Sequence, residues 1–343
     1  MEAFVDRGQT VLLKPDLMWD YPGGTGPVSD LEFVAAVGRL AARRGARVLV
    51  GDSPFVLRDT IEDFWYQTGV AGVARREGFE LVNFEKAGST AMPVETAVYY
   101  ISRAVKAADV VINIPRLKAD LWTGFAGGLR NVLGVLPGFQ KGRLYKRGFS
   151  PRSLARTLVD VFSLVRPHLT ILEAPAENGL SRAGGDSPGF ILASRDTVAL
   201  DTVVSVVLGF DLNKMHAIRY AADAGLGIGW PEGIVVAGEK LEKVTRAIRR
   251  SVTRRTLGFV PGMALHLVEP MLWMRSVVNE DICDGCGACI EFCPTKALRV
   301  RDGSRIPSID YTLCINCWAG LSNCPARAIN LRQSRFTRRV FAV

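Results

Sequence analysis

The chain has 343 residues, of which 48% are hydrophobic and 22% are charged, and it contains 34 glycines. These values are typical of folded globular proteins and exclude the disordered, collagen-like and coiled-coil classes. The net charge of +9 comes from ten arginines in two segments, 246–255 and 327–339. Neither segment comes with a recognisable nucleic-acid-reading motif, so we do not expect nucleic acid as a partner.

The sequence shows no sign of a leader or of a membrane span. No uncharged apolar run reaches about 18 residues, the length that a spanning helix needs. Residues 1–10 lack a basic start followed by an apolar run, which a signal peptide would show. The sequence therefore predicts a cytoplasmic protein.

The first 240 residues alternate short β-branched runs with helical patterns, and we interpret them as one domain, 1–240. Buried strands are predicted at 9–15, 46–52, 108–115, 168–174 and 188–194. Apolar residues at helical spacing predict helices at 30–44, 153–165 and 197–208. This alternation predicts an α/β fold with a largely parallel sheet, flanking helices, and ligands bound beyond the carboxyl ends of the strands.

The loops after these strands are rich in glycine and in polar residues. Glycine lets backbone N–H groups approach a ligand, and Lys or Arg nearby favours phosphate or carboxylate, so an anionic small molecule is the expected ligand. We expect catalytic roles for Lys14, Asp52 and Lys118. The expected substrate-binding residues are Asn113, Arg116, Thr123, Gly127, Gly128 and Asn131. The alternative is that these loops are solvated structural turns.

Other motifs in this region fail on their context. The chain has no dinucleotide-binding glycine motif and no P-loop. Residues 185–189 match a nucleophile elbow by letter, but a predicted strand follows where an elbow needs a helix. His168, His216 and His266 are too far apart for a local zinc motif and are assigned no role.

Residues 241–278 are predicted to connect the domains. Val244, Ile248 and Val252 recur every four residues among arginines, and an apolar stretch interrupted by prolines follows. A basic amphipathic helix of this kind can lie on an anionic membrane surface. We favour a linker packed between the two domains over peripheral membrane contact, because membrane binding needs an exposed apolar face.

All seven cysteines lie between Cys283 and Cys324. Such a cluster in a chain without a leader indicates metal or redox chemistry rather than a disulfide framework. The first run of cysteines, from Cys283 to Cys293, is followed by Pro294 and has the bacterial ferredoxin spacing C-x2-C-x2-C-x3-C-P. In this spacing the fourth thiolate binds the other cluster. The second run ends before Pro325 and has Gly320 at its third position.

The spacing predicts two iron–sulfur clusters. The ligands expected for a first 4Fe-4S cluster are Cys283, Cys286, Cys289 and Cys324. The ligands expected for the second are Cys293, Cys314 and Cys317. Because glycine has no side chain, one iron of the second cluster lacks a thiolate, which leaves a 3Fe-4S cluster or a 4Fe-4S cluster with one open corner.

The cysteines define a small ferredoxin-like α+β domain at 279–331, followed by a basic tail at 332–343. This domain is too small to hold a good hydrophobic core, so the clusters would also stabilise its fold. Zinc knuckles are the alternative, since thiolates also bind zinc, but three-cysteine runs with paired Cys-Pro endings fit them poorly.

Five blocks of the chain resemble, in order and spacing, the family catalogued as domain of unknown function 362. The blocks lie at 12–30, 48–54, 110–134, 169–179 and 189–203. Many members of that family carry a C-terminal ferredoxin module, and the resemblance implies the same organisation here without implying a substrate. Members usually have asparagine where Asp16 stands, lysine where Arg130 stands and a complete second cysteine run.

The expected function is that of an iron–sulfur oxidoreductase that receives electrons from a redox partner protein and passes them singly to an anionic substrate or cofactor. Whether a flavin takes part is left open. One alternative is a non-enzymatic electron carrier or cluster-bearing adaptor for a protein partner. The other is a non-redox enzyme that uses the open iron of the second cluster as a Lewis acid.

Overall fold

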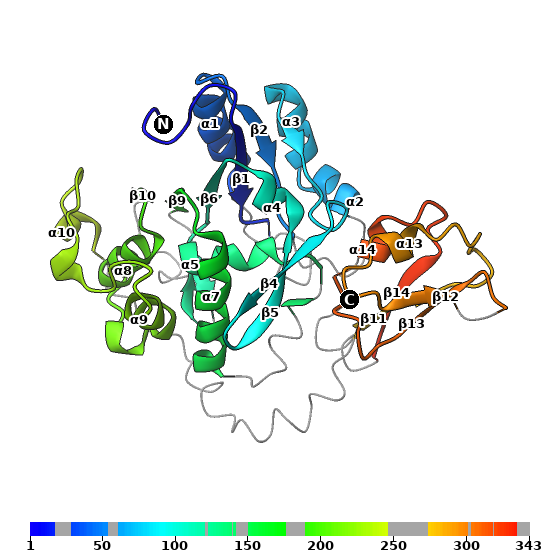
Figure 1. The fold of residues 1–343 in the computed structure, drawn as a ribbon. Coiled ribbons are helices and arrows are strands. Elements are labelled where there is room, and N and C mark those ends of the chain that lie inside the picture. The colour runs from blue at the N-terminus through cyan, green and yellow to red at the C-terminus, as the bar shows by residue number, and fades with distance from the viewer. Residues whose placement is uncertain are drawn as a thin grey trace.

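The computed structural model describes residues 1–17, 29–53, 61–120, 123–138, 140–141, 150–175, 189–245, 274–300, 303–317 and 319–334. They form an α/β domain and a small C-terminal module at one side of it, shown in orange and red (Figure 1). Residues 246–273 of the segment predicted between the domains, residues 185–188 of the nucleophile-elbow match and residues 335–343 of the basic tail lie outside the described residues. Within the described residues, no helix is long and apolar enough to span a bilayer.

A six-stranded sheet with the order β10-β9-β6-β1-β2-β3 forms the centre of the domain. Its strands are β1 (Thr10–Pro15), β2 (Arg47–Val50), β3 (Glu80–Leu81), β6 (Val110–Ile114), β9 (Leu169–Ala174) and β10 (Phe190–Ser194). All neighbours pair in parallel except β9 and β10. The predicted α/β fold with a largely parallel sheet is confirmed, and each of the five predicted runs contains a strand.

Helices cover both faces of the sheet because successive side chains of a strand point in opposite directions. Val11 and Leu13 of β1 belong to the cluster that includes α1 (Leu31–Ala42) and α3 (Val70–Glu77). Leu12 belongs to the cluster on the other face, which includes α7 (Pro151–Val165) and α8 (Thr197–Val207). The three predicted helices are thus present as α1, α7 and α8.

Short elements connect this framework. Before α7 they are α2 (Ile61–Gln67), β4 (Ser89–Val94), β5 (Ala97–Ser102), α4 (Arg103–Ala107), β7 (Lys118–Asp120), β8 (Gly124–Ala126), α5 (Gly128–Asn131) and η1 (Val132–Val135). After α8 they are η2 (Leu212–Lys214), α9 (His216–Asp223), η3 (Pro231–Gly233) and α10 (Leu241–Val244). The β7–β8 hairpin leads directly into α5, so the chain after β6 folds back over the carboxyl ends of the central strands.

The C-terminal module has two similar halves. Its elements are β11 (Met274–Val278), α13 (Ala288–Glu291), β12 (Leu298–Val300), β13 (Pro307–Ile309), α14 (Ala319–Ser322) and β14 (Ile329–Gln333). Strand β11, which lies in the segment expected to be connector, pairs antiparallel with β14, and β12 pairs with β13. The buried core contains Cys289, Leu298 and Ile329, which is small for an independent domain.

Candidate functional site

A buried ion pair joins the carboxyl ends of the two central strands β1 and β2. Lys14 Nζ lies 2.8 Å from Asp52 Oδ1, and the two side chains are only 2% and 4% exposed. The other carboxylate oxygen of Asp52 accepts a hydrogen bond from the Leu17 N–H at 3.0 Å. A buried charge that loses its partner is strongly destabilising, so these side chains fix each other in place.

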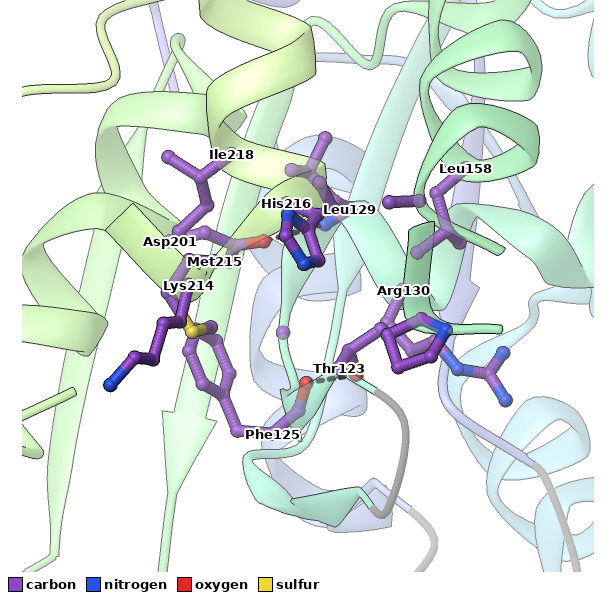
Figure 2. Close-up of a pocket in the computed structure, with 14 residues that line it drawn as sticks. Thr123, Phe125, Leu129, Arg130, Leu158, Asp201, Lys214, Met215, His216 and Ile218 are labelled. Atoms are coloured by element: carbon purple, nitrogen blue, oxygen red, sulfur yellow. Dashed lines mark hydrogen bonds between the residues drawn. The ribbon is translucent and has the colours of Figure 1, made fainter. Parts of the chain in front are cut away.

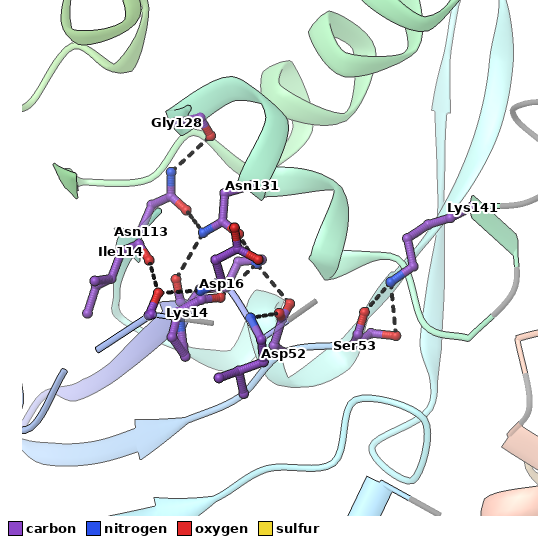
Figure 3. Close-up of polar contacts among 12 residues, drawn as sticks. Lys14, Asp16, Asp52, Ser53, Asn113, Ile114, Gly128, Asn131 and Lys141 are labelled. Atoms are coloured by element: carbon purple, nitrogen blue, oxygen red, sulfur yellow. Dashed lines mark hydrogen bonds and ion pairs between the residues drawn. The ribbon is translucent and has the colours of Figure 1, made fainter. Parts of the chain in front are cut away.

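Two asparagines extend this ion pair across the sheet. Lys14 Nζ donates to Asn131 Oδ1 at 3.1 Å, and Asn131 Nδ2 donates to Asn113 Oδ1 at 2.9 Å. Asn113, the register partner of Lys14 on β6, in turn donates to the Gly128 carbonyl at 3.0 Å. The structure therefore brings four of the predicted residues, Lys14, Asp52, Asn113 and Asn131, into one buried network (Figure 3).

Gly134 allows η1 to pass directly over the ion pair. A Cβ at this position would overlap Asp52 Oδ1 and would lie 2.5 Å from Lys14 Nζ. The Gly134 carbonyl also accepts a hydrogen bond from the Ser53 N–H at 3.1 Å. Close backbone approach thus requires glycine here, and no pattern in the sequence marked Gly134 for this role.

Other predicted residues make separate contacts. Lys118 Nζ lies 3.0 Å from Asp16 Oδ2, and its side chain is 14% exposed. Arg116 pairs with Glu173 at 3.5 Å, on a different strand from the Lys14 network. Thr123 donates to Asp120 Oδ1 at 2.8 Å and so belongs to the β7–β8 turn.

Gly127 and Gly128 lie against Asp201, a buried carboxyl that was not among the predicted site residues. Asp201 on α8 accepts hydrogen bonds from the N–H groups of Gly128 at 2.7 Å and Leu129 at 2.9 Å. A Cβ on Gly127 would overlap Asp201 Oδ1. Burial raises the pKa of Asp201 to about 7. Its signal in the sequence is one acidic residue inside the apolar run of α8.

A second buried polar group adjoins Asp52 and consists of Ser53, Glu85 and Lys141. Ser53 Oγ donates to Glu85 Oε1 at 2.7 Å, and Lys141 Nζ donates to the Ser53 carbonyl. Burial raises the pKa of Glu85 to about 7 and lowers that of Lys141 to about 8. Glu85 Oε2 has no hydrogen-bond partner among the described residues. The three residues are far apart in the chain, and no local sequence pattern links them.

Gly138 joins this group to the cysteine module. Its N–H donates to Ser53 Oγ at 2.9 Å and to Glu85 Oε1 at 3.0 Å. Its φ is +61°, and a Cβ would lie 2.5 Å from the carbonyl carbon of Cys317 and 2.6 Å from its oxygen. The backbone at Gly138 therefore lies in direct contact with the second cysteine run.

The structure arranges the cysteines in two groups. Burial is the main cause that raises the pKa of Cys289 to about 11. The neighbouring thiols of Cys324, Cys283 and Cys286 raise this pKa further. Burial likewise raises the pKa of Cys317 to about 12, with additions from Cys293 and Cys314. The last cysteine of each run thus lies with the first cysteines of the other run. Thiols with such pKa values need a bound metal to be held as thiolates at neutral pH.

Several observations bear on whether these cysteines fit iron–sulfur clusters. The N–H groups of Ala297 and Ala328 each point to a sulfur, Cys293 Sγ and Cys324 Sγ respectively, at 3.2 Å. Such N–H···S bonds tune cluster potentials. A cavity of about 410 Å³, including its part open to solvent, is lined by Cys293, Cys314, Cys317 and Gly320 among others. Within the described residues no three Cys, His, Asp or Glu side chains are grouped to hold a single metal ion. The donor set and the cavity fit a cluster, in which each thiolate binds its own iron; the ligand assignment stays a prediction.

Two family models match separate parts of the chain. The model described as domain of unknown function (DUF362) matches residues 11–205, more than half of the chain. The model described as 4Fe-4S binding domain matches residues 276–299. A thylakoid-associated protein of Synechocystis sp. is 28% identical over 271 residues, which are 72% of this chain and 81% of that protein.

Two solved structures show a distant likeness to the chain. The lactate racemase apoprotein from Thermoanaerobacterium thermosaccharolyticum shares 12% identity and a TM-score of 0.42, over 57% of this chain and 48% of that one. A protein from Thermotoga maritima shares 14% identity and a TM-score of 0.37, over 65% of this chain and 55% of that one. The chain thus spans about half the length of these solved chains.

The substitution Gly134→Ala tests the close approach over the ion pair. The added methyl group should displace the Lys14 and Asp52 side chains and lower the free energy of unfolding by about 1–3 kcal/mol. Gly72→Ala is the control, because Gly72 lies in α3 with negative φ and a Cβ there would meet nothing within 4 Å. Urea unfolding followed by circular dichroism measures both, and equal stabilities would contradict the tight approach.

Proposed function

The chain belongs to the DUF362 family and carries a 4Fe-4S binding domain, and from this premise we propose that it is an iron–sulfur oxidoreductase. The 4Fe-4S binding domain indicates electron transfer or redox chemistry. In the proposal, a redox partner protein supplies electrons to the module, and the module passes them singly to an anionic small molecule at the strand ends of the α/β domain.

The contact between Gly138 and Cys317 is the observation that carries this proposal. Electron transfer slows steeply with distance, so the route into the α/β domain should begin where the two parts touch. Cys317 lies against Gly138, and Gly138 is hydrogen-bonded to Ser53 and Glu85. Ser53 follows Asp52 directly in the chain, so the module meets the α/β domain beside the buried Lys14 network.

Two sets of thiolates would hold the clusters, which accept and release single electrons when bound. Cys283, Cys286, Cys289 and Cys324 would hold the outer cluster. Cys293, Cys314 and Cys317 would hold the inner one, next to Gly138. Cys286 is exposed while Cys317 is buried, which favours entry of electrons at the first group and their exit at the second.

The α/β residues would shape the acceptor site. Lys14 and Asp52 are too deeply buried to serve as a surface for a large partner, and they hold Asn113 and Asn131 in position. Lys118, the more exposed of the two lysines, places a positive charge beside Asp16 at the same strand ends. The ammonium group of Lys118 has three N–H donors, so it can donate to an anionic acceptor as well as to Asp16.

A Lewis-acid enzyme is the second candidate, favoured by one observation. Gly320 borders the cavity that Cys293, Cys314 and Cys317 line, and it offers no side-chain ligand. An iron at that corner would be free to polarise an oxygen of a bound molecule.

The substitution Gly138→Ala tests the proposed electron route. A Cβ would clash with the backbone of Cys317, so the module should be displaced while its cysteines stay intact. We expect unchanged iron and sulfide content but at least about tenfold slower electron transfer, a change of roughly 1.4 kcal/mol in the barrier. The measurement is reoxidation of dithionite-reduced protein by the small molecule retained after anaerobic purification.

Gly225→Ala is the matched control, because Gly225 has φ +67° and a Cβ there would meet nothing within 4 Å. It carries the same backbone strain without the clash. Oxidation by ferricyanide, which needs no α/β site, should be equal in all three proteins. If Gly138→Ala transfers electrons as fast as the wild type, the contact is not the route. If the wild type transfers none, the carrier or adaptor function replaces the oxidoreductase.

The substitution Gly320→Cys tests the composition of the second cluster. A Cβ at Gly320 would lie 2.9 Å from Leu298 Cδ1 and 3.5 Å from Cys289 Cβ, and the end of the Leu298 side chain can shift. Electron paramagnetic resonance of anaerobically purified wild type should show a three-iron signal that added ferrous iron converts. Gly320→Cys should show two stable four-iron clusters, and Gly320→Ala should behave as the wild type. Two unchanged four-iron clusters in all three proteins would mean that another ligand fills the corner.

A further inference from the structure

We propose that Glu85 takes up one proton when one electron enters the second cysteine group, which consists of Cys293, Cys314 and Cys317. The electron comes from the redox partner protein, or from an electrode in the test, and the proton comes from solvent. The Glu85 carboxylate becomes a neutral carboxylic acid in the same step. The proposal rests on the second cluster of the proposed function, but it does not depend on any electron acceptor in the α/β domain.

Glu85 is a buried carboxyl with one oxygen left unpaired. It lies in the loop after β3 and is 1% exposed. Its Oε1 accepts hydrogen bonds from Ser53 Oγ at 2.7 Å and from the Gly138 N–H at 3.0 Å. Among the described residues, its Oε2 has no hydrogen-bond partner. A buried charge costs more free energy than a buried neutral group, so protonation relieves a cost that these contacts do not fully offset.

The buried lysine nearby is directed at Ser53 rather than at Glu85. Lys141 Nζ donates to the carbonyl and the hydroxyl of Ser53 (Figure 3). Within the described part of the chain, no ion pair joins Lys141 to Glu85. Asp52, in contrast, lies 2.8 Å from Lys14 and accepts a backbone N–H at 3.0 Å. Of these two buried carboxyls, Glu85 therefore loses less when it is protonated.

The other charged groups around Glu85 are paired or lie in water. Groups facing it come from five other elements and from its own loop: Lys14 and Asp52 at the strand ends, Lys141 after η1, Arg130 in α5, Glu62 in α2, Arg103 in α4, Lys86 in its own loop and Cys317 in the module. Lys14 pairs with Asp52, Lys86 with Glu62 and Arg130 with Asp120, while Arg103 is exposed. Burial raises the pKa of Glu85 to about 7 and lowers that of Lys141 to about 8, so these two groups change charge near neutral pH.

Gly138 places Glu85 beside the second cysteine group. The Gly138 N–H donates to Glu85 Oε1, and a Cβ on Gly138 would lie 2.5 Å from the carbonyl carbon of Cys317. Burial, and in addition the charge of Glu85, raise the pKa of Cys317. An electron added at this group brings a further negative charge close to Glu85, and a nearby like charge disfavours the ionised carboxylate. By reciprocity, protonation of Glu85 favours electron entry to the same extent.

Asp201 is a similar carboxyl without this link to the module. Burial raises its pKa to about 7, and the charge of Asp196 adds to the effect. Both of its oxygens accept backbone N–H groups, at 2.7 Å and 2.9 Å. It lies in the wall of a cleft between α5, α7 and the start of α9, together with Met215 and His216 (Figure 2). Asp201 therefore serves as a matched control for Glu85.

Redox potentiometry of the anaerobically purified full chain, followed by electron paramagnetic resonance between pH 6 and pH 9, tests the proposal. In the wild type, the midpoint potential of the second cluster should be constant below about pH 7 and should fall by about 59 mV in total above it. This fall corresponds to a tenfold rise in the proton affinity of Glu85 on reduction. The potential of the first cluster should change less, because the charges that act on Cys289 are those of other cysteines. A second-cluster potential that does not depend on pH would overturn the proposal.

The substitution Glu85→Gln removes the proton acceptor and keeps an oxygen for the Ser53 and Gly138 donors. The second-cluster potential of this variant should be independent of pH and close to the wild-type value at pH 6, where Glu85 is neutral. Asp201→Asn should keep the pH dependence of the wild type. If Glu85→Gln keeps it as well, the proton goes elsewhere and the proposal is wrong.

Infrared difference spectroscopy of the wild type needs no variant and still decides if Glu85→Gln does not fold. Electrochemical reduction at pH 7.5 should produce the C=O stretch of a protonated carboxyl group, and its absence would contradict the proposal. These outcomes are separate from the electron-transfer experiment. A pH-linked potential in a protein that passes no electrons to the retained small molecule would refute the proposed function and keep the proton uptake. A potential without pH dependence in a protein that does pass them would do the reverse.

Discussion

Two opposite charges buried together at the ends of β1 and β2 set the geometry on which the rest of the site depends. Neither Lys14 nor Asp52 reaches water, so each needs the other and the groups around them to be held in register. Asn131 accepts a hydrogen bond from Lys14 and donates one to Asn113, so the ion pair positions both asparagines. The backbone at Gly134 packs directly over the ion pair. The segment after Gly134 then runs on to Gly138, where the cysteine module rests. The ion pair thus positions the segment from Gly134 to Gly138, and this segment forms the surface that the cysteine module contacts.

The sequence alone predicted the framework because its signals are local. Short β-branched runs and helical spacing identified five strands and three helices, and parallel pairing explains why Lys14 and Asn113 meet. The two-residue strand β3 carried no such signal, since its pairing depends on the neighbouring strand rather than on its own residues. The family assignment and the cysteine spacing were likewise visible, because ferredoxin ligands follow one another at fixed intervals.

The parts of the site that escaped prediction are those that tertiary packing brings together. Ser53, Glu85 and Lys141 come from three separate segments, and each looks like an ordinary polar residue in its own surroundings. Gly138 is distinguished from other loop glycines by its contact with Cys317, and no sequence pattern predicts that contact. His216, which was given no role, lines the cleft beside Asp201 because α9 folds against α7 and α8. In contrast, Arg116 was grouped with the site by its place in the chain, whereas it pairs with Glu173.

The central claim is that the second cysteine group holds a redox cluster against the α/β domain at Gly138. Nuclear magnetic resonance of the deuterated, anaerobic full chain tests it most directly, by comparing amide signals in the oxidised and dithionite-reduced states. Both states of a three-iron cluster are paramagnetic, with different spins, so the signals of Ser53, Glu85 and Gly138 should be broadened to different extents in the two states, while those of a remote residue such as Gly225 stay sharp in both. Broadening confined to residues of the cysteine module would contradict the account.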